Sequence, residues 1–297
     1  MANKLGSIAN ISFMRFKILS LLLLFLQFQF HLFSQSDEFK KDLINNMINA
    51  IEAHNHVEFI MIRNERNDKG FTYGEFYAKV QNEPFKLYIK NEVPKVGSEI
   101  LYIKGENDDK ALVNPNSFPY ISISLAPENS LLLAGGHHCV KETGFKFMSN
   151  MFKQYQKNYG NKLYEIMQYE GIYNWNQRKC HKISIIYPDY QKLNYRAKEG
   201  ENLYSISRKK LLNVDKLRTY NPDIDDTESL DEGQTIIINN VYAKKAVVFI
   251  DKENYFPIYQ VIYDEEGIYE KYKYTNLNLN VNFSQQEFKS DYKDYNF

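Results

Sequence analysis

Val57-Glu58-Phe59-Ile60-Met61-Ile62-Arg63 decides the fold, because this stretch is short, apolar and rich in β-branched and aromatic residues. Such a run is typical of a β-strand. Similar runs follow at 71–80, 85–90 and 99–104, and residues typical of turns separate them, namely Asn67-Asp68-Lys69-Gly70, Asn82-Glu83-Pro84 and Pro94-Lys95-Val96-Gly97. Strands joined by turns this short pair as antiparallel neighbours. The sequence therefore predicts an antiparallel meander.

Helical periodicity appears before and after this meander. Within 37–54, Phe39, Leu43, Met47 and Ile51 recur every four residues, which predicts an amphipathic helix that packs on an apolar surface. The same spacing predicts a second helix within 142–158. Strand patterns return at 163–173, 179–187, 245–250, 258–263 and 269–274, and Ser284-Gln285-Gln286-Glu287 has the pattern of a capping box that opens a short helix. The predicted class is α+β.

The composition of the 297 residues fits a β-rich globular protein. Apolar residues make up 43% and charged residues 25%, values that exclude a wholly disordered chain. The 24 Tyr and 20 Phe favour strands. Lysine plus arginine equals aspartate plus glutamate, 37 of each, and a chain without net charge is a poor candidate for binding nucleic acid.

The N-terminal segment has the layout of a secretory signal peptide. Met14-Arg15-Phe16-Lys17 is basic, 18–33 is apolar, and Ser34-Gln35-Ser36 is polar. We expect a signal peptide over 1–34, with Met14 as an alternative start that leaves 1–13 untranslated; a membrane anchor is the other interpretation. No lipobox cysteine is present near the cleavage site, so a periplasmic or secreted protein is expected.

The two cysteines, Cys139 and Cys180, are the candidate disulfide of an exported protein. Two free, buried thiols are the first alternative. A metal site is the second, because His137 and His138 precede Cys139 and His181 follows Cys180. The spacing matches no usual zinc pattern, so neither a metal nor another cofactor is predicted.

Residues 195–240 differ from their surroundings and predict strand, helix, helix, strand. Tyr195-Arg196-Ala197-Lys198 reads as a strand, Asn202 as the cap of a first helix, and Asn221-Pro222 as the end of a second. Thr235-Ile236-Ile237-Ile238 reads as the closing strand. The block interrupts the strand pattern of its host, 37–194 and 241–297, so it is expected to be an insertion in a surface hairpin.

The block resembles a lysin motif (LysM) domain. The resemblance rests on Gly200-Glu201-Asn202-Leu203-Tyr204-Ser205-Ile206, Val214, Leu217, Asn221-Pro222-Asp223-Ile224, Leu230 and Gly233-Gln234. It implies a βααβ fold that binds peptidoglycan or another N-acetylglucosamine-containing glycan. The implied groove consists of Gly200, Glu201, Asn202, Leu203 and Tyr204 on one side and Asn221, Pro222, Asp223 and Ile224 on the other. Alternatively, the same residues only build turns and caps. Lys209-Lys210-Leu211-Leu212-Asn213 departs from the family by lacking the usual glycine between the helices.

The host resembles an uncharacterised bacterial family related to the LolA/LolB lipoprotein carriers. Short segments carry this resemblance: Leu101-Tyr102-Ile103-Lys104-Gly105, Phe256-Pro257-Ile258, Tyr263-Asp264-Glu265-Glu266-Gly267 and Glu287-Phe288. It implies a curved antiparallel half-barrel of about eleven strands, with helices that plug an apolar face and an acyl-chain or lipoprotein-like ligand. The strand residues expected on the inward face are Phe59, Met61, Phe76, Leu87, Ile89, Leu101, Ile103, Ile185 and Ile258. The other interpretation of these residues is a plain packed core.

Three classes of function remain open at this point. The favoured class is a non-catalytic envelope protein that binds glycan through 195–240 and an apolar ligand or a protein through the host. A peptidoglycan hydrolase is the second class, although neither a Cys-His pair nor opposed carboxylates stand out in the sequence. The third is an interaction scaffold without a glycan ligand.

Overall fold

The computed structural model describes residues 36–133, 136–225 and 227–297. The predicted signal peptide, 1–34, lies outside these ranges. No helix among the described residues is long and apolar enough to cross a membrane.

An antiparallel sheet of eleven strands forms the host, in the order β6-β5-β4-β3-β2-β1-β13-β12-β11-β8-β7. The strand bounds are β1 His56–Asn67, β2 Gly70–Gln81, β3 Lys86–Val93, β4 Glu99–Ile103, β5 Ala111–Asn114, β6 Ile123–Leu125, β7 Met167–Trp175, β8 Arg178–Ile186, β11 Lys245–Asp251, β12 Pro257–Asp264 and β13 Gly267–Asn278. Hydrogen bonding between β1 and β13 joins the two halves of the sheet, with Met61 opposite Tyr274. The predicted meander and open antiparallel sheet are confirmed.

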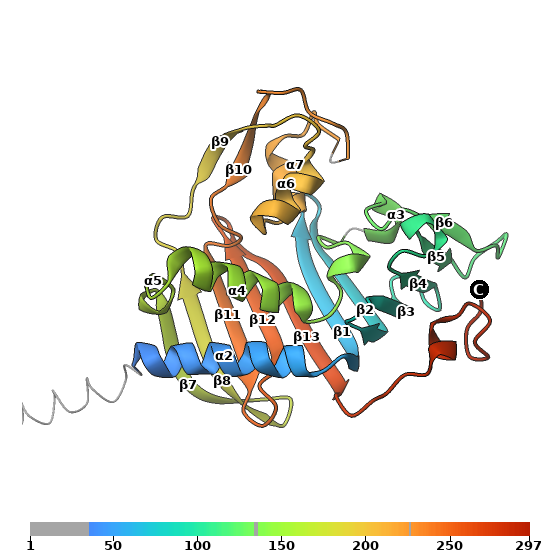
Figure 1. Cartoon of the computed structure of the whole chain (residues 1–297), viewed down its shortest axis with the longest axis horizontal. Helices are drawn as coiled ribbons and strands as arrows, with labels where there is room; N and C mark the ends of the chain where they lie inside the picture. Colours follow the sequence, from blue (N-terminus) through green and yellow to red (C-terminus); the bar gives the residue numbers. More distant parts are fainter. Residues whose placement is uncertain (1–35, 134–135, 226) are drawn as a thin grey trace, which may run out of the picture.

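Helices cover one face of this sheet, which we call the inner face (Figure 1). The main ones are α2 (Asp37–Ala53) and α4 (Lys146–Tyr159), with the short α3 (Ser130–Leu133), α5 (Lys162–Glu165) and the 3₁₀ turns η1 (Asn107–Asp109) and η2 (Val140–Glu142). The fully buried ring of Phe59 contacts Phe145 at 5.5 Å and Tyr274 at 5.2 Å between ring centroids. Edge-on ring pairs of this kind add to the hydrophobic stabilisation of the core.

The C-terminal segment covers part of the opposite, outer face. It contains η3 (Gln285–Phe288), whose capping box at Ser284 was predicted. Tyr295 stacks on Tyr88 of β3 with centroids 3.7 Å apart. Leu101 and Ile103 belong to this outer cluster, so the prediction that they face inward is wrong. Their neighbours Ile100 and Tyr102 take the inward positions because successive strand residues alternate between faces.

The block at 195–240 has the predicted order of elements and a hydrophobic core of its own. It consists of β9 (Lys192–Arg196), α6 (Leu203–Lys210), α7 (Val214–Tyr220) and β10 (Thr235–Asn239), and β9 pairs with β10 as an antiparallel ribbon. Leu203, Ile206 and Leu217 are fully buried in its core. Leu211 takes the left-handed conformation between the helices, at φ 53°, a region that glycine adopts more readily than leucine.

The predicted disulfide is wrong, because the sheet holds the two cysteines apart. Cys180 lies on β8, whereas Cys139 precedes η2 two residues after His137, which contacts Glu270 of β13, and β11 and β12 lie between these two strands. Strands are about 4.8 Å apart, so the separation far exceeds disulfide geometry. Both cysteines are free and buried.

Candidate functional site

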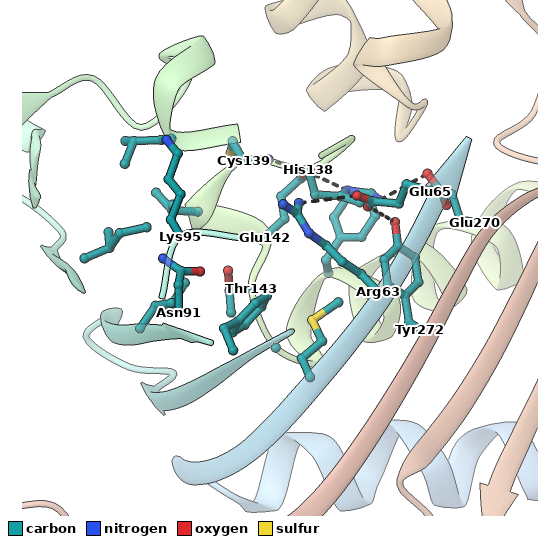
Figure 2. Close-up of a pocket in the computed structure, with 18 of the residues that line it drawn as sticks. Arg63, Glu65, Asn91, Lys95, His138, Cys139, Glu142, Thr143, Glu270 and Tyr272 are labelled. Atoms are coloured by element: carbon teal, nitrogen blue, oxygen red, sulfur yellow. Dashed lines mark hydrogen bonds and ion pairs between the residues drawn. The ribbon is translucent and has the colours of Figure 1, made fainter. Parts of the chain in front are cut away.

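A cavity of about 270 Å³ lies between the inner face of the sheet and the segment that runs from β6 to α4 (Figure 2). The sheet contributes apolar side chains that alternate along β1–β5, and the helical segment closes the other side. The apolar lining includes Met61, Phe76, Ile89, Ile100, Val113, Ile123, Leu125, Leu131, Leu132, Phe147, Met148 and Met151. Most of the wall is therefore apolar and includes three flexible methionines.

One end of the cavity carries buried acidic side chains. Glu65 of β1 and Glu270 of β13 are register partners, and at 1% and 0% exposure both are buried. Glu65 accepts a hydrogen bond from the Tyr272 hydroxyl at 2.6 Å and pairs with Arg63 at 3.3 Å. Glu270 accepts hydrogen bonds from Tyr242 at 2.9 Å and from Asn213. Buried carboxylates need such partners, because an unpaired buried charge is strongly destabilising.

His137 is a further partner of Glu270. Its Nδ1 lies 2.8 Å from Glu270 Oε1, and its Nε2 lies 2.9 Å from the Arg66 carbonyl oxygen. Both partners only accept, so the ring can make both hydrogen bonds only as an imidazolium. Burial alone would lower the pKa of His137, but the hydrogen bond and charge of Glu270 raise it. Burial alone would raise the pKa of Glu270, whereas the hydrogen bonds from His137 and His138 hold it well below its usual range.

His138 and Glu142 connect this acidic end to the block. His138 Nδ1 lies 2.9 Å from Glu142 Oε2, and its Nε2 lies 2.9 Å from the Tyr242 hydroxyl. Glu142 also forms an ion pair with Arg208 of α6. The first helix of the block is therefore joined to a buried carboxylate of the cavity wall.

Further side chains of the block contact the host beside this end. Asn213, the N-cap of α7, donates to Glu270, and Asp215 accepts from the Tyr269 hydroxyl at 2.6 Å. Lys216 forms an ion pair with Asp264, and the Tyr204 hydroxyl lies 3.2 Å from Cys139 Sγ. The block thus packs firmly against the host, beyond what an insertion at an exposed hairpin requires.

Several residues of the predicted glycan groove have structural roles instead. Leu203 is in the core of the block, and Tyr204 faces the host. Asn221 is buried: its amide donates to the carbonyls of Leu217 and Ile237 and its oxygen accepts from the Ile237 amide. These bonds tie the end of α7 to β10.

The other predicted groove residues lie nearer the surface, except for Glu201, which is buried. Asn202 caps α6 through the Ser205 amide at 2.7 Å, and the carboxylate of Glu201 accepts from Lys209, Tyr195 and the Lys198 amide. Gly200, Pro222 and Asp223 are exposed, and Ile224 is half-buried. The surface left for a ligand is much smaller than the nine predicted residues.

The histidines that were weighed as metal ligands do not come together. His181 lies on β8 and contacts the Tyr169 hydroxyl at 3.0 Å, whereas His137 and His138 are bound to carboxylates near β13. In the described part of the chain, no three His, Cys, Asp or Glu side chains form a group that could hold a metal. Burial raises the pKa of the Cys139 thiol, which disfavours the thiolate that a nucleophile requires.

Glu65 and Glu270 are the site residues that the sequence did not single out. Their only signal was an acid at an inward-facing strand position, two residues from Arg63 and from Tyr272 respectively. Such a position is recognisable only once the register is known.

Comparison with known proteins gives one family and several distant structures. Residues 54–220, more than half of the chain, match the model of a family described as a protein of unknown function, DUF1571. This range includes β9 and both helices of the block, and its description mentions no lysin motif. No curated protein matches the sequence.

The solved structures with some likeness to the chain include a lipoprotein, a LolA superfamily protein and a lipoprotein-sorting protein domain. Lipoprotein LppX of Mycobacterium tuberculosis is 12% identical, with 84% of this chain and 100% of that chain covered and a TM-score of 0.41. A LolA superfamily protein of Nitrosomonas europaea is 9% identical, with 85% and 98% covered and a TM-score of 0.33. A putative outer membrane lipoprotein-sorting protein domain of Vibrio parahaemolyticus is 10% identical, with 86% and 98% covered and a TM-score of 0.34. Likeness at this level leaves the ligand and activity of the chain open.

Proposed function

The chain belongs to the DUF1571 family, and we propose that it is an exported, non-catalytic protein that binds an apolar chain in the cavity on the inner face of its sheet. The observation that carries this proposal is the apolar wall of that cavity, formed by strands on one side and by α3, η2 and α4 on the other. Burying a methylene group in such a wall is worth about 0.8 kcal/mol, so an acyl chain gains affinity along its length.

The acidic end of the cavity disfavours an anionic group of a ligand. Glu65, Glu142 and Glu270 each have an ion pair or a hydrogen bond within the protein. Glu65 Oε2 accepts no hydrogen bond within the described part of the chain, but the carboxylates of this end repel an anionic group, so the carboxylate of an acyl chain is expected at the other side. At the other side of the cavity, Ile123 and Leu131 are 42% and 59% exposed, and Lys95 is exposed. The chain is therefore expected to enter there.

Titration with a dansyl-labelled undecanoic acid tests this proposal. We expect saturable binding with enhanced dansyl fluorescence, displaced by unlabelled palmitate. Met151→Trp adds volume inside the cavity and should weaken binding about tenfold or more. Ile172→Trp adds the same ring at a residue that is 44% exposed on β7, outside the cavity, and should not alter binding.

Thermal unfolding of each variant separates loss of binding from loss of fold. If the native protein shows no saturable binding, or if folded Met151→Trp binds as well as the native protein, the cavity is a packing defect and the proposal fails.

Glycan binding by the block is a second candidate, favoured by the strand-helix-helix-strand arrangement with its own core. Because Asn202 and Asn221 hold the block together, the informative variant is Asp223→Ala with Ile224→Ala, at the surface of the predicted groove. After sedimentation with insoluble peptidoglycan, the native protein should be found in the pellet and the double variant in the supernatant. Absence of the native protein from the pellet would leave the block as part of the host's structure.

A further inference from the structure

The outer face of strands β7, β8, β11, β12 and β13 combines aromatic rings with lysines. One register row runs Lys182, Phe249, Tyr259, Lys273 across four adjacent strands. Residues directly opposite one another point to the same side of a sheet, so these four side chains form one row. We call the surface formed by these four side chains together with Tyr173, Trp175, Lys245 and Lys271 the aromatic–lysine face.

Its rings form a contiguous group. Phe249 lies 6.0 Å from Tyr173 and 5.2 Å from Tyr259 between centroids. Trp175 stacks on Tyr259 at 5.4 Å with the ring planes 7° apart. Tyr173 is 43% exposed, and the other three rings are half-buried. The rings therefore present a joined apolar surface to solvent.

Positive charge is in excess on the same face. Arg178 pairs with Asp251 at 2.5 Å and Lys182 with Glu170 at 2.5 Å. Lys245, Lys271 and Lys273 point to this side as well, and within the described residues no carboxylate lies at ion-pairing distance from any of them. The charge of Lys245 acts on Glu170, so Lys271 and Lys273 carry the excess, and lysines without a nearby carboxylate attract an anionic partner.

On the rest of the outer face, the C-terminal segment of the chain covers a surface of similar composition. Over β2–β5, the C-terminal segment buries Phe283 and Phe288 and stacks Tyr295 on Tyr88, and Lys79 pairs there with Glu287 at 2.9 Å. The aromatic–lysine face has the same combination of rings and lysines. No described segment of the chain provides the matching rings and acids.

We propose that the aromatic–lysine face binds an acidic polysaccharide. The apolar faces of the sugar rings lie on Phe249, Tyr259 and Trp175, and the carboxylates lie beside Lys271 and Lys273. The open, half-apolar sheet suits an extended chain of rings, whereas two lysines in excess on a chain without net charge are few for a nucleic acid. This site is separate from the cavity, which opens on the other face.

Trp175 makes the proposal directly measurable because it is the only tryptophan of the chain. We expect polygalacturonate to change its emission saturably and dextran, which is neutral, to leave it unchanged. Binding should disappear near 1 M NaCl, where charges are screened within about 3 Å. Affinity electrophoresis in gels that contain polygalacturonate gives a second readout. It also measures binding by the variant Trp175→Phe, which has no tryptophan emission.

Lysine variants place the site. Lys271→Gln with Lys273→Gln should weaken binding of polygalacturonate roughly tenfold. The matched control is Lys41→Gln with Lys104→Gln, two exposed lysines on α2 and after β4, which should bind as the native protein does. No emission change and no retardation, or equal weakening in both double variants, overturns the proposal. Equal or tighter binding of polyglutamate or of an oligothymidylate overturns the assignment to a polysaccharide, because the face would then select charge alone.

Discussion

At the scale of single residues, the acidic end of the cavity is defined by the pairing of Glu270 with His137. Neither group could be buried in charged form without the other, since each would be an isolated charge in a medium of low polarity. The pKa of Glu270 is lowered and that of His137 is raised, so each group favours the charged form of the other. Their partners come from the strand β13, the segment before η2 and the helix α7.

This pairing predicts how stability depends on pH. A raised pKa for His137 contributes stability that is complete below its ordinary value of 6.5 and is lost as the pH rises through the folded value. A lowered pKa for Glu270 contributes stability that is complete above its ordinary value of 4.5 and is lost as the pH falls through the folded value. The contributions of the pair are therefore both complete between these ordinary values, and thermal unfolding should show a lower Tm at pH 9 than at pH 6.

The variant Glu270→Gln isolates the pair. It should lower the free energy of unfolding by about 3–5 kcal/mol at pH 6, because His137 loses its nearest counter-charge in a buried site and keeps only Asp215, at 3.5 Å. It should also flatten the alkaline part of the pH profile. An unchanged profile in the folded variant would show that His137 does not carry it.

The cysteines give a second prediction at this scale. Because Cys139 and Cys180 are both buried and unbonded, the native protein should react slowly with a thiol reagent, and the unfolded protein should release two thiols without any reductant. Thiol titration of protein purified under oxidising conditions measures this. Detection of fewer than two thiols in the unfolded chain would support the predicted disulfide instead.

At the scale of elements, α6 and α7 act as one docking unit for the host. Arg208 of α6 contacts Glu142, and Asn213 and Asp215 at the start of α7 contact Glu270 and Tyr269. The left-handed Leu211 turns the chain between the two helices, so both contacts can be made at once. The block is thereby fixed beside the cavity.

Removing one of these contacts should therefore cost more than a surface ion pair does. Arg208→Ala leaves the side chain of Glu142, which is 4% exposed, without its cation and should lower the free energy of unfolding by about 3 kcal/mol. Lys210→Ala, on the same helix but exposed, should change it little. Urea unfolding of both variants measures the difference, and equal values would mean that α6 is not docked through Arg208.

At the scale of the whole molecule, the two hydrophobic cores should behave as one folding unit. The block and the host each bury their own apolar residues, but the polar contacts between them are themselves buried. Replacing 192–239 by a short glycine-serine linker would leave Glu270 and Glu142 without Asn213 and Arg208.

We therefore expect the deletion to lower the Tm of the host strongly, by well over the roughly 2–4 °C that 1 kcal/mol represents in a domain of this size. Differential scanning calorimetry of the native protein should show a single unfolding transition. A shortened host with the native Tm would contradict the coupling and support an independent inserted module.

The sequence by itself determined the elements. The apolar run Val57–Arg63 and the turns after it predicted the meander, and Asn202 with Asn221-Pro222 predicted the two helices of the block, because such runs, turns and caps are local patterns. The prediction that Leu101 and Ile103 face inward was wrong, because the face they occupy depends on which side of the sheet the C-terminal segment covers. The prediction of a disulfide between Cys139 and Cys180 was wrong as well.

Only the tertiary structure decided the site. Glu65 and Glu270 are 205 positions apart and meet because β1 pairs with β13, and His137 and Asn213 reach the same carboxylate from two further segments. No local pattern encodes such a meeting, since it depends on the order of strands in the sheet and on where the block docks. The groove residue Asn221 illustrates the same point: its residue type suits a ligand contact, and the neighbouring strand β10 makes it a structural link.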